Sequence, residues 1–404
     1  MKIAIVIDSA QPRGGAELLT RTLKRGLLER GHDARVFAAG PLDEPGNFAD
    51  ANCKAYDGVV LTVTRAVNLT AASAFKAFID AFEPDVVHLR MMLTQLSPTL
   101  LRVIGDRPCI YHADYLELVC PTGLKMLPDK SLCKVRPGLP CLRNGCLSAP
   151  AWGAQMVSRK LLRRWSKSID MIVPSSGPVK RMLEEDGWSP RPVVPSCVPV
   201  CDVRPPLEGP PTVGCAARLV PEKGVDLLLR AAAVVKKDVP DLRVVIAGDG
   251  PQRAELERLA SETGLRDAVR FLGQVDRDVL DDALNQSWVQ AAPSRWVEAF
   301  GLVAAEGMMR GTAMLVSRSA GLAEIVTDGE TGYIVERGEW EPMVEPLRRL
   351  LADREHAETM GRAARERALA CYSPSVCLDK FETLYDELID RRAIGASERS
   401  TSKG

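Results

Sequence analysis

Apolar residues along the chain follow two patterns, short runs rich in Val and Ile and longer segments with helical spacing. Short apolar runs that alternate with helical segments are typical of parallel sheets covered by helices on both faces. The pattern therefore predicts an α/β fold. In the first half the predicted strands are Lys2–Ile7, Ala34–Ala38, Gly58–Val63, Asp85–Leu89, Cys109–His112 and Ile169–Pro174, with helices that include Ala16–Arg30 and Leu69–Phe82.

The alternation is interrupted at Asp202–Pro211, where four prolines stand within ten residues. Such a segment cannot continue a helix or a central strand, so we interpret it as a linker. A second alternation follows. Its predicted strands are Thr212–Ala217, Leu242–Ala247, Val269–Leu272, Val289–Ala292, Ala313–Val316 and Gly332–Val335.

The length of 404 residues exceeds what one hydrophobic core usually covers. We therefore expect two doubly wound domains, residues 1–200 and 201–372. Such sheets bind ligands beyond the carboxyl ends of their strands, so two opposed units predict a site in the cleft between them. The last predicted helix, Pro374–Arg391 within residues 373–392, either caps the second domain or crosses back to the first. Ala393–Gly404 is small and polar, and we expect it to be disordered.

Charge and composition narrow the function classes. Lys plus Arg and Asp plus Glu both number 53, so no overall field favours nucleic acid as a partner. Met1–Asp8 leads directly into a strand-like run, which does not favour secretion. No apolar run approaches the roughly 18 residues of a membrane span. We therefore expect a cytoplasmic enzyme.

Two cations follow the first strand of the second half. Arg218 comes directly after Thr212–Ala217, and Lys223 follows at the start of a helix. A guanidinium, an ammonium and a helix amino end together favour binding of a pyrophosphate. A solvated surface pair with Glu222 is the alternative.

Gly248-Asp-Gly-Pro251 follows a fully apolar strand. Its glycines allow a ligand to approach the backbone or allow positive φ, and a plain tight turn is equally consistent. The loop lacks the third glycine of the dinucleotide fingerprint, and the sequence contains no phosphate-loop Gly-Lys-Ser/Thr motif. Both absences argue against dehydrogenases and phosphate-loop ATPases.

The segment from Pro293 to Glu306 carries the most specific pattern. A helix that begins near Phe300 leaves the amides of Gly301, Leu302 and Val303 free to hold a diphosphate. Glu298 and Glu306 beside such an anion site favour hydrogen bonds from hydroxyl groups, which sugars and ribose supply. A capping glutamate with an unrelated helix charge is the alternative.

The order of Arg218, Lys223, Gly248-Asp-Gly, Phe271-Leu-Gly273, Pro293-Ser294, Glu298 and Glu306 resembles the family-4 retaining glycosyltransferases of GT-B fold. The resemblance covers nearly the whole chain. It implies two Rossmann-like domains facing across a cleft, with the N-terminal domain on the acceptor side and the C-terminal domain binding the donor. It also implies that Arg218 and Lys223 bind the donor diphosphate, Glu298 contacts the transferred sugar and Glu306 binds ribose. The loop Gly273–Val275 would then lie near the nucleobase.

The first half carries two further motifs. Gly14-Gly15-Ala16-Glu17 follows the first strand and opens a helix, and it resembles the family element that approaches donor phosphates or acceptor. A flexible turn at a helix start is the alternative. His112 ends another strand, where the family often places a histidine next to the transferred sugar. A buried histidine with its hydrogen bonds satisfied is the competing interpretation.

Eleven cysteines scattered over the chain favour reduced thiols or a metal site over a disulfide framework. Cys120, Cys133, Cys141 and Cys146 share a Gly- and Pro-rich segment, and four thiolates can form a structural zinc or iron site. Their spacing contains no Cys-x-x-Cys pair, so free thiols or a disulfide remain alternatives. Part of the family has a His-Asp element followed by Cys-Pro, whereas here Ala113 separates His112 from Asp114.

Residues 158–167 form a basic amphipathic segment. It contains Lys160, Arg163, Arg164 and Lys167 interleaved with Leu161, Leu162 and Trp165. Such a helix can contact anionic headgroups on the cytoplasmic face of a membrane and meet a lipid-linked acceptor. A solvated helix face is the alternative.

We therefore expect a hexosyltransferase that moves a sugar from a nucleoside diphosphate to a hydroxyl of a glycan, a lipid-linked or a small-molecule acceptor. Retention at the anomeric carbon is implied by the resemblance alone. Arg218, Lys223 and helix amides would stabilise the leaving diphosphate, so catalysis would require no metal cofactor. Glu298 would orient the sugar and His112 would hold one of its hydroxyls. A sugar-nucleotide epimerase of the same architecture and a non-catalytic sugar-nucleotide-binding protein are alternatives, and UDP and GDP donors both remain open.

Overall fold

The computed structural model describes residues 1–11 and 14–401, and its contacts divide the chain into two units. Unit 1 comprises residues 1–128, 133–197 and 374–404, and unit 2 comprises residues 129–132 and 198–373. Each unit contains one six-stranded sheet whose neighbouring strands are all parallel. The predicted α/β class with two doubly wound sheets is confirmed.

The sheet of unit 1 has the strand order β3-β2-β1-β4-β5-β6. Its strands are β1 (Lys2–Ser9), β2 (Asp33–Ala39), β3 (Ala51–Cys53), β4 (Val86–Leu89), β5 (Cys109–Ala113) and β6 (Met171–Pro174). Its helices are α1 (Gly15–Glu29), α2 (Gly58–Thr64), α3 (Leu69–Phe82), α4 (Leu101–Ile104), α5 (Leu139–Arg143), α6 (Ala149–Trp165), α7 (Gly177–Glu185) and α15 (Pro374–Thr401).

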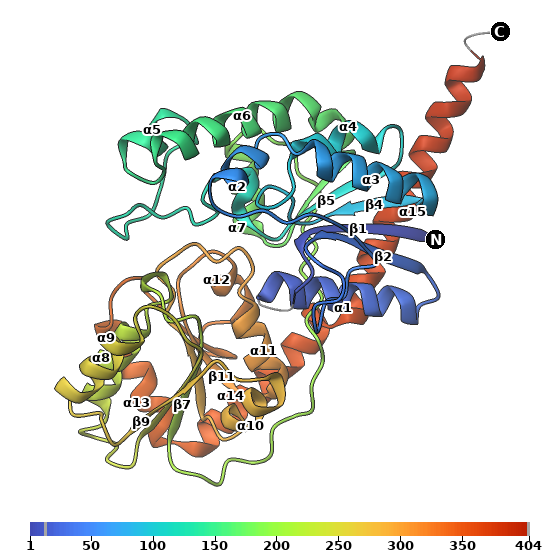
Figure 1. The fold of residues 1–404 in the computed structure, drawn as a ribbon. Coiled ribbons are helices and arrows are strands. Elements are labelled where there is room, and N and C mark those ends of the chain that lie inside the picture. The colour runs from blue at the N-terminus through green and yellow to red at the C-terminus, as the bar shows by residue number, and fades with distance from the viewer. Residues whose placement is uncertain (12–13, 402–404) are drawn as a thin grey trace. The chain divides into compact units, whose positions relative to one another are not determined.

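Helices bury both faces of this sheet. On one face, Leu23 and Leu27 of α1 share a core with Phe381 and Tyr385 of α15. Figure 1 shows α15, in red, beside α1 and β4. On the other face, Phe37 of β2 packs against the aromatic side chains of α3. Helix α15, although last in the chain, therefore supplies part of the core of unit 1.

The sheet of unit 2 has the order β12-β11-β10-β7-β8-β9. Its strands are β7 (Thr212–Ala216), β8 (Arg243–Ala247), β9 (Val269–Gly273), β10 (Val289–Ala292), β11 (Ala313–Ser317) and β12 (Gly332–Val335). Its helices are α8 (Val225–Val235), α9 (Arg253–Glu262), α10 (Arg277–Leu284), α11 (Leu302–Arg310), α12 (Gly321–Ile325), α13 (Val344–Ala352) and α14 (Arg354–Tyr372). Leucines and valines of α8 and α13 form its core with β7, β8 and β10.

The two sheets have the same topology. In each, the first and fourth strands lie side by side, β1 with β4 in unit 1 and β7 with β10 in unit 2. The strand order reverses between these neighbours, and doubly wound sheets bind ligands at the carboxyl ends of such a pair. A ligand-binding site is therefore expected in the loops after β1, β4, β7 and β10.

One predicted strand is wrong. Gly58–Val63 was expected as the third strand, but Gly58–Thr64 forms helix α2 and the edge position of the sheet is taken by β3. A valine-rich run forms a strand only where neighbouring strands and helices bury its side chains, because strand preference reflects packing more than backbone preference. The valines of α2 are exposed, so nothing holds them in a sheet.

The expectation of disorder from Ala393 onward is also wrong for part of that tail. Helix α15 continues to Thr401, and residues 402–404 lie outside the described part of the chain. The tail contains no proline to stop the helix, and each added residue of an existing helix gains a hydrogen bond without a new nucleation step. Polarity alone therefore did not predict where the helix ends.

Candidate functional site

Lys223 and Glu298 meet at the carboxyl ends of β7 and β10. Lys223 closes the short 3₁₀ helix Pro221–Lys223, and Gly224 follows with φ of +67°. A Cβ on Gly224 would lie 2.1 Å from the carbonyl oxygen of Pro293, so glycine lets this turn pack directly on the end of β10. The close approach places Lys223 Nζ 2.6 Å from Glu298 Oε1.

Glu298 is buried and held by several donors. Ser294 Oγ donates to the same Oε1 atom at 2.8 Å, and the backbone N–H of Glu298 donates to Ser319 Oγ at 3.3 Å. Burial alone would raise the pKa of Glu298, but the charge of Lys223 and the hydrogen bonds to the carboxylate bring that pKa below its ordinary value. Glu298 is therefore a fixed, ionised acceptor.

Two side chains that sequence reasoning missed support this pair. The ring of Trp296 lies under Lys223, with Nζ 4.4 Å from the ring centroid. Arg295 donates to both carboxylate oxygens of Asp226 at 2.6 and 2.7 Å. The signal in the sequence was their position between Ser294 and Glu298, two residues of the predicted site.

Arg218, the other predicted cation, is in a different environment. Its side chain is 64% exposed, and the nearest carboxylate oxygen, on Glu222, lies 4.0 Å away. An exposed pair at this distance contributes little to stability. The structure thus contains the surface pair considered above, and it leaves most of the Arg218 guanidinium open to solvent.

The glycines after β8 serve backbone packing. Gly248 and Gly250 have φ of +128° and +159°, and a Cβ on either would lie within 2.5 Å of a carbonyl oxygen in the loop after β7. The N–H of Gly248 donates to the carbonyl oxygen of Gly273 at 2.8 Å. Val275, two residues beyond that contact, is half-buried. The loops after β7, β8 and β9 are therefore packed together by their main chains.

Helix α11 begins at Leu302, so Gly301 precedes its first turn and is not part of it. Gly301 is its N-cap with φ of +101°, and Leu302 is the first helical residue. The first amides of a helix have no partner within it, so Leu302 and Val303 still present free donors to an anion. The Phe300 side chain is buried edge-to-face on Tyr372, at 5.7 Å between ring centroids. Phe300 thus anchors the start of α11.

Glu306 lies in an ion-pair network that the sequence did not reveal. The guanidinium of Arg277, from α10, binds the Glu306 carboxylate and also Asp281 at 3.0 Å. Arg310 donates to Asp281 at 2.8 Å and to Gln290 at 2.6 Å. Burial alone would lower the pKa of Arg277, but Glu306 and Asp281 raise it above its ordinary value. The carboxylate of Glu306 is thus oriented before any ligand binds.

In unit 1, the Gly14-Gly15 motif forms the start of α1, with Gly14 as its N-cap and Gly15 as its first residue. The Glu17 side chain folds back over Gly14, since a Cβ there would lie 2.7 Å from Glu17 Oε2. Burial raises the pKa of Glu17, and the nearby charges of Asp114 and Asp8 raise it further. The motif therefore places a carboxyl group of weakened acidity at the amino end of α1.

His112 is fully buried in β5. Its Nε2 donates to the carbonyl oxygen of Val194 at 3.1 Å, while Nδ1 has no partner among the described residues. The ring packs against Phe381 at 4.9 Å between centroids. Burial, followed by the charge of Arg90, lowers the pKa of His112 well below its ordinary value, so the ring is neutral. The contact with a sugar stays a prediction. The histidine is buried, as the competing interpretation expected, but among the described residues only one of its two ring nitrogens is hydrogen-bonded.

A set of buried charges that the sequence did not predict surrounds the ends of β1, β4 and β5. Arg90 and Asp114 form an ion pair with side-chain exposures of 0% and 2%. Arg90 Nε and Nη1 and Asp114 Oδ1 have no partner among the described residues. Arg90 directly follows β4, so this pair occupies the same topological position in unit 1 as the Pro293–Glu298 segment does in unit 2.

Two buried carboxyl groups hold the loop after β4. Asp8 accepts from the amides of Thr94, Gln95 and Leu96 at 2.7 to 2.9 Å. Glu117 accepts from the amides of Met92 and Leu93 at 3.0 and 3.2 Å and from the Tyr111 hydroxyl. Burial and the charge of Asp8 raise the pKa of Glu117 to about 8. Glu117 is therefore protonated in the folded protein near neutral pH.

The four cysteines of the segment from Cys120 to Cys146 are brought near one another. The Lys125 amide donates to Cys120 Sγ at 3.4 Å, and the Cys133 amide donates to the Lys125 carbonyl at 2.9 Å. Burial raises the pKa of Cys146, and Cys141, Cys133 and Cys120 contribute to the same shift. Cys120, Cys133, Cys141 and Cys146 are free thiols. No group of three or more ligand side chains in residues 1–11 and 14–401 has the arrangement of a metal site, so the metal stays a prediction.

The basic segment divides into an inward and an outward part. Arg163 stacks on Trp188 at 3.7 Å and binds Asp186 at 2.5 Å. Lys160, Arg164 and Lys167 are exposed and follow helical spacing. Among the described helices, no single one is long and apolar enough to cross a membrane.

Two family models together cover most of the chain. Residues 13–200 match the model described as Glycosyltransferase Family 4, and residues 203–367 match the model described as Glycosyl transferases group 1. The chain belongs to the family-4 glycosyltransferases.

Relatives agree with this assignment. An uncharacterized glycosyltransferase of Bacillus subtilis is 29% identical over 71% of this glycosyltransferase and 82% of the relative. A GDP-mannose-dependent alpha-(1-6)-phosphatidylinositol monomannoside mannosyltransferase of Mycolicibacterium smegmatis is 36% identical, over 39% of this chain and 43% of that protein. Matches such as the latter span less than half of the relative.

Solved structures show the same fold. Sucrose-phosphate synthase from Thermosynechococcus elongatus superimposes with a TM-score of 0.71 over 97% of this chain and all of that one, at 21% identity. The Anabaena protein HepE, solved in complex with UDP, gives a TM-score of 0.71 over 96% of this chain and all of that one, at 18% identity. The glycosyltransferase therefore has the GT-B fold.

Proposed function

We propose that this glycosyltransferase moves a sugar from a nucleoside diphosphate sugar to a hydroxyl acceptor, with retention at the anomeric carbon and without a metal ion. The observation that carries the proposal is the Lys223–Glu298 pair beside the amino end of α11, at the ends of β7 and β10. A fixed cation, a fixed carboxylate and free amides at one strand-order reversal suit a sugar diphosphate.

Stabilisation of the leaving diphosphate is the main chemical task. Lys223 and the amides of Leu302 and Val303 supply positive charge and hydrogen bonds without moving when charge develops on the phosphate. Arg218, whose guanidinium is mostly exposed, can reach the same phosphates as a mobile second cation. These groups replace the charge that a divalent cation would otherwise provide, which supports metal independence.

The carboxylates of Glu298 and Glu306 accept hydrogen bonds from hydroxyl groups of the donor. Glu298 is ionised and can only accept, so it suits a sugar hydroxyl donor, and its bonds to Lys223 and Ser294 fix the direction from which that donor arrives. Glu306 is oriented by Arg277 and suits the ribose hydroxyls. Neither carboxylate is assigned as a covalent nucleophile, so departure and attack on one face of the sugar is the proposed route to retention.

The ligands and donors of similar proteins support the donor class. HepE is solved with UDP and with UDP-glucose, and the mycobacterial relative is named as GDP-mannose-dependent. We therefore propose a nucleoside diphosphate hexose and leave the base to experiment. The acceptor remains a hydroxyl of a glycan, a lipid-linked molecule or a small molecule.

A panel of UDP- and GDP-sugars, tested by thermal shift, identifies the donor. A ligand present at 100 times its Kd and bound only by the folded state adds about 2.7 kcal/mol of stability, which raises Tm measurably. The selected donor is then incubated with excess EDTA, without and with acceptor. Release of nucleoside diphosphate that increases with acceptor supports the proposal, and an isomeric sugar nucleotide in the absence of acceptor indicates an epimerase instead.

A further inference from the structure

Helix α2 presents an apolar surface to solvent. Val59, Val60 and Val63 are 82%, 52% and 64% exposed, and Val67 and Leu69, which follow the helix, are 41% and 67% exposed. We refer to these five side chains as the α2 surface. Scattered apolar residues are ordinary on soluble proteins, but a concentrated exposed group marks an interaction site.

Neither burial nor helix propensity accounts for these residues. Every residue of α2 is at least partly exposed, so its valines add little to the core of unit 1. Five of its seven residues are β-branched, a composition that disfavours a helix, and seven residues are too few for a stable isolated helix. The sequence of α2 thus makes physical sense if an apolar environment covers it.

The helix that packs against α2 carries exposed positive charge. Helix α2 packs against α6, as Figure 1 shows within unit 1. On α6 and the turn after it, Lys160, Arg164 and Lys167 are exposed, and none of the three forms an ion pair with a described residue. We refer to these three residues as the cationic stripe. Arg163, on the same helix, is by contrast bound to Asp186.

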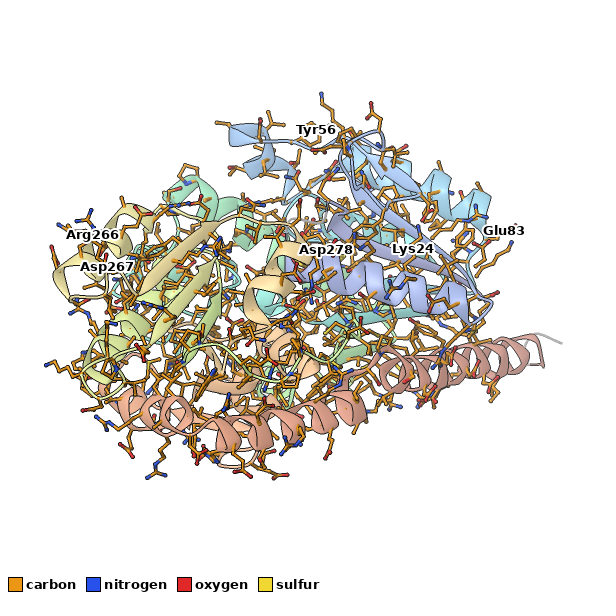
Figure 2. All side chains as sticks on the ribbon, turned by 90° about the horizontal axis from the view of Figure 1, so that it is seen from below. Lys24, Tyr56, Glu83, Arg266, Asp267 and Asp278 are labelled. Atoms are coloured by element: carbon orange, nitrogen blue, oxygen red, sulfur yellow. The ribbon has the colours of Figure 1, made fainter. Side chains whose placement is uncertain are left out.

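The segment that precedes α2 also combines an apolar ring with positive charge. Figure 2 shows Tyr56 at the edge of unit 1, and Lys54 Nζ lies 5.5 Å from the centre of its ring. A tyrosine with an apolar ring and a polar tip suits the boundary between acyl chains and headgroups. Asp57 is the one exposed carboxylate between Lys54 and Leu69, so the charges of this segment and of the cationic stripe sum to positive.

We propose that the α2 surface and the cationic stripe together dock unit 1 on an anionic lipid bilayer. The valines and Leu69 enter the boundary of the acyl region, and the cations contact lipid phosphates. Each cation near an anionic surface strengthens the attraction, and the buried apolar area adds to this. Charge complementarity favours lipid over a second copy of the chain, whose identical surface carries the same positive charge.

Vesicle flotation with the full chain tests the proposal. Vesicles of phosphatidylcholine alone are compared with vesicles that also contain phosphatidylglycerol, at low and high salt. We expect binding to the anionic vesicles that weakens with salt. Val59→Asp with Val63→Asp should lower the bound fraction at least tenfold, and Lys160→Ala with Arg164→Ala and Lys167→Ala should do the same.

Matched controls come from exposed helical positions in unit 2. Val279→Asp on α10 changes a valine that is 52% exposed, and Arg258→Ala on α9 removes an arginine that is 71% exposed. Both should float as the wild type does. Because all of these residues are exposed, each variant should keep its Tm, which is measured alongside.

The proposal is overturned if the wild type fails to float with anionic vesicles at low salt, or if the α2 variants bind them unchanged. A dimer in size-exclusion chromatography that becomes a monomer in the α2 variants would assign the surface to a second copy and also overturn it. Donor-induced thermal shifts are recorded for every variant. They should stay at the wild-type value, so failure of lipid docking is distinguishable from failure of the proposed transfer.

Discussion

The two sheets share one topology but use the ends of their strands differently. At the ends of β7 and β10, Arg218 is 64% exposed and Lys223 is 17% exposed, beside the free amides of α11. At the ends of β4 and β5, Arg90 and Asp114 are sealed at 0% and 2%. The shared topology therefore determines where a site can form in each sheet. Exposed charges at the strand ends can bind an ionic ligand, whereas buried charges pair with one another and hold the neighbouring loops.

The largest effect is expected from a variant that breaks the buried Arg90–Asp114 ion pair, which we call the sealed edge of unit 1. Arg90→Ala leaves Asp114 buried without its cation, and loss of one member of such a pair costs about 3–5 kcal/mol. Urea unfolding followed by circular dichroism measures the change. The double variant Arg90→Ala with Asp114→Asn should regain part of the loss. A single variant as stable as the wild type would show that the pair is not a buried structural contact.

A substitution at the ends of β7 and β10, the open edge of unit 2, should change the rate of sugar transfer. Lys223→Ala is expected to lower kcat by about 10²–10³-fold, the usual result of removing one preorganised group that stabilises developing charge. Initial rates of nucleoside diphosphate release give the comparison. Urea unfolding of Lys223→Ala beside the wild type checks that the loss is not one of folding. Lys237→Ala, an exposed lysine on the same unit, should retain full rate.

Gly224 links the turn that carries Lys223 to the end of β10. Gly224→Ala meets the Pro293 carbonyl at 2.1 Å, and Gly264→Ala, at φ of +75°, meets nothing within 4 Å. Both variants bear the strain of positive φ, about 1 kcal/mol. Only Gly224→Ala should also lose transfer activity, by about tenfold or more, because the turn must shift by over 1 Å. Equal activities of the two variants would contradict the proposed role of this contact.

The smallest effect concerns Glu117 and pH. Its pKa is raised from an ordinary 4.5 to about 8 by burial first and then by Asp8, so between these values the folded state holds a proton that the unfolded state lacks. Stability from this group is therefore present at low pH and falls as pH rises towards 8, by about 1 kcal/mol per pH unit. Unfolding free energies at pH 6 and 7 should show the slope, and Glu117→Gln should remove it.

Most strands and the residues at the ends of β7 and β10 were predictable because their signals are local. Short apolar runs predict strands in a parallel sheet, and Lys223, Glu298 and Gly301 lie in the segments that follow two such strands. Helix α2 was mispredicted because a valine-rich run has the same composition whether it is covered by a sheet or exposed on a surface. Only the three-dimensional neighbours distinguish the two.

The sealed edge was not predictable for a related reason. Arg90 and Asp114 are 24 positions apart, and Asp8 reaches amides 86 to 88 positions away. No spacing rule connects such partners, because parallel strands bring them together only after the sheet has formed. The same holds for Arg277 and Glu306, whose contact depends on how α10 packs beside α11.

Helix α15 has a consequence for how the protein is made. Unit 2 apart from residues 129–132 is one continuous stretch, whereas the core of unit 1 needs Phe381 and Tyr385, which are synthesised after unit 2. Domains fold as units while the ribosome is still extending the chain. The half translated first must therefore wait, incompletely packed, while the half translated later is already able to fold, and a chaperone would meet the N-terminal half in that interval.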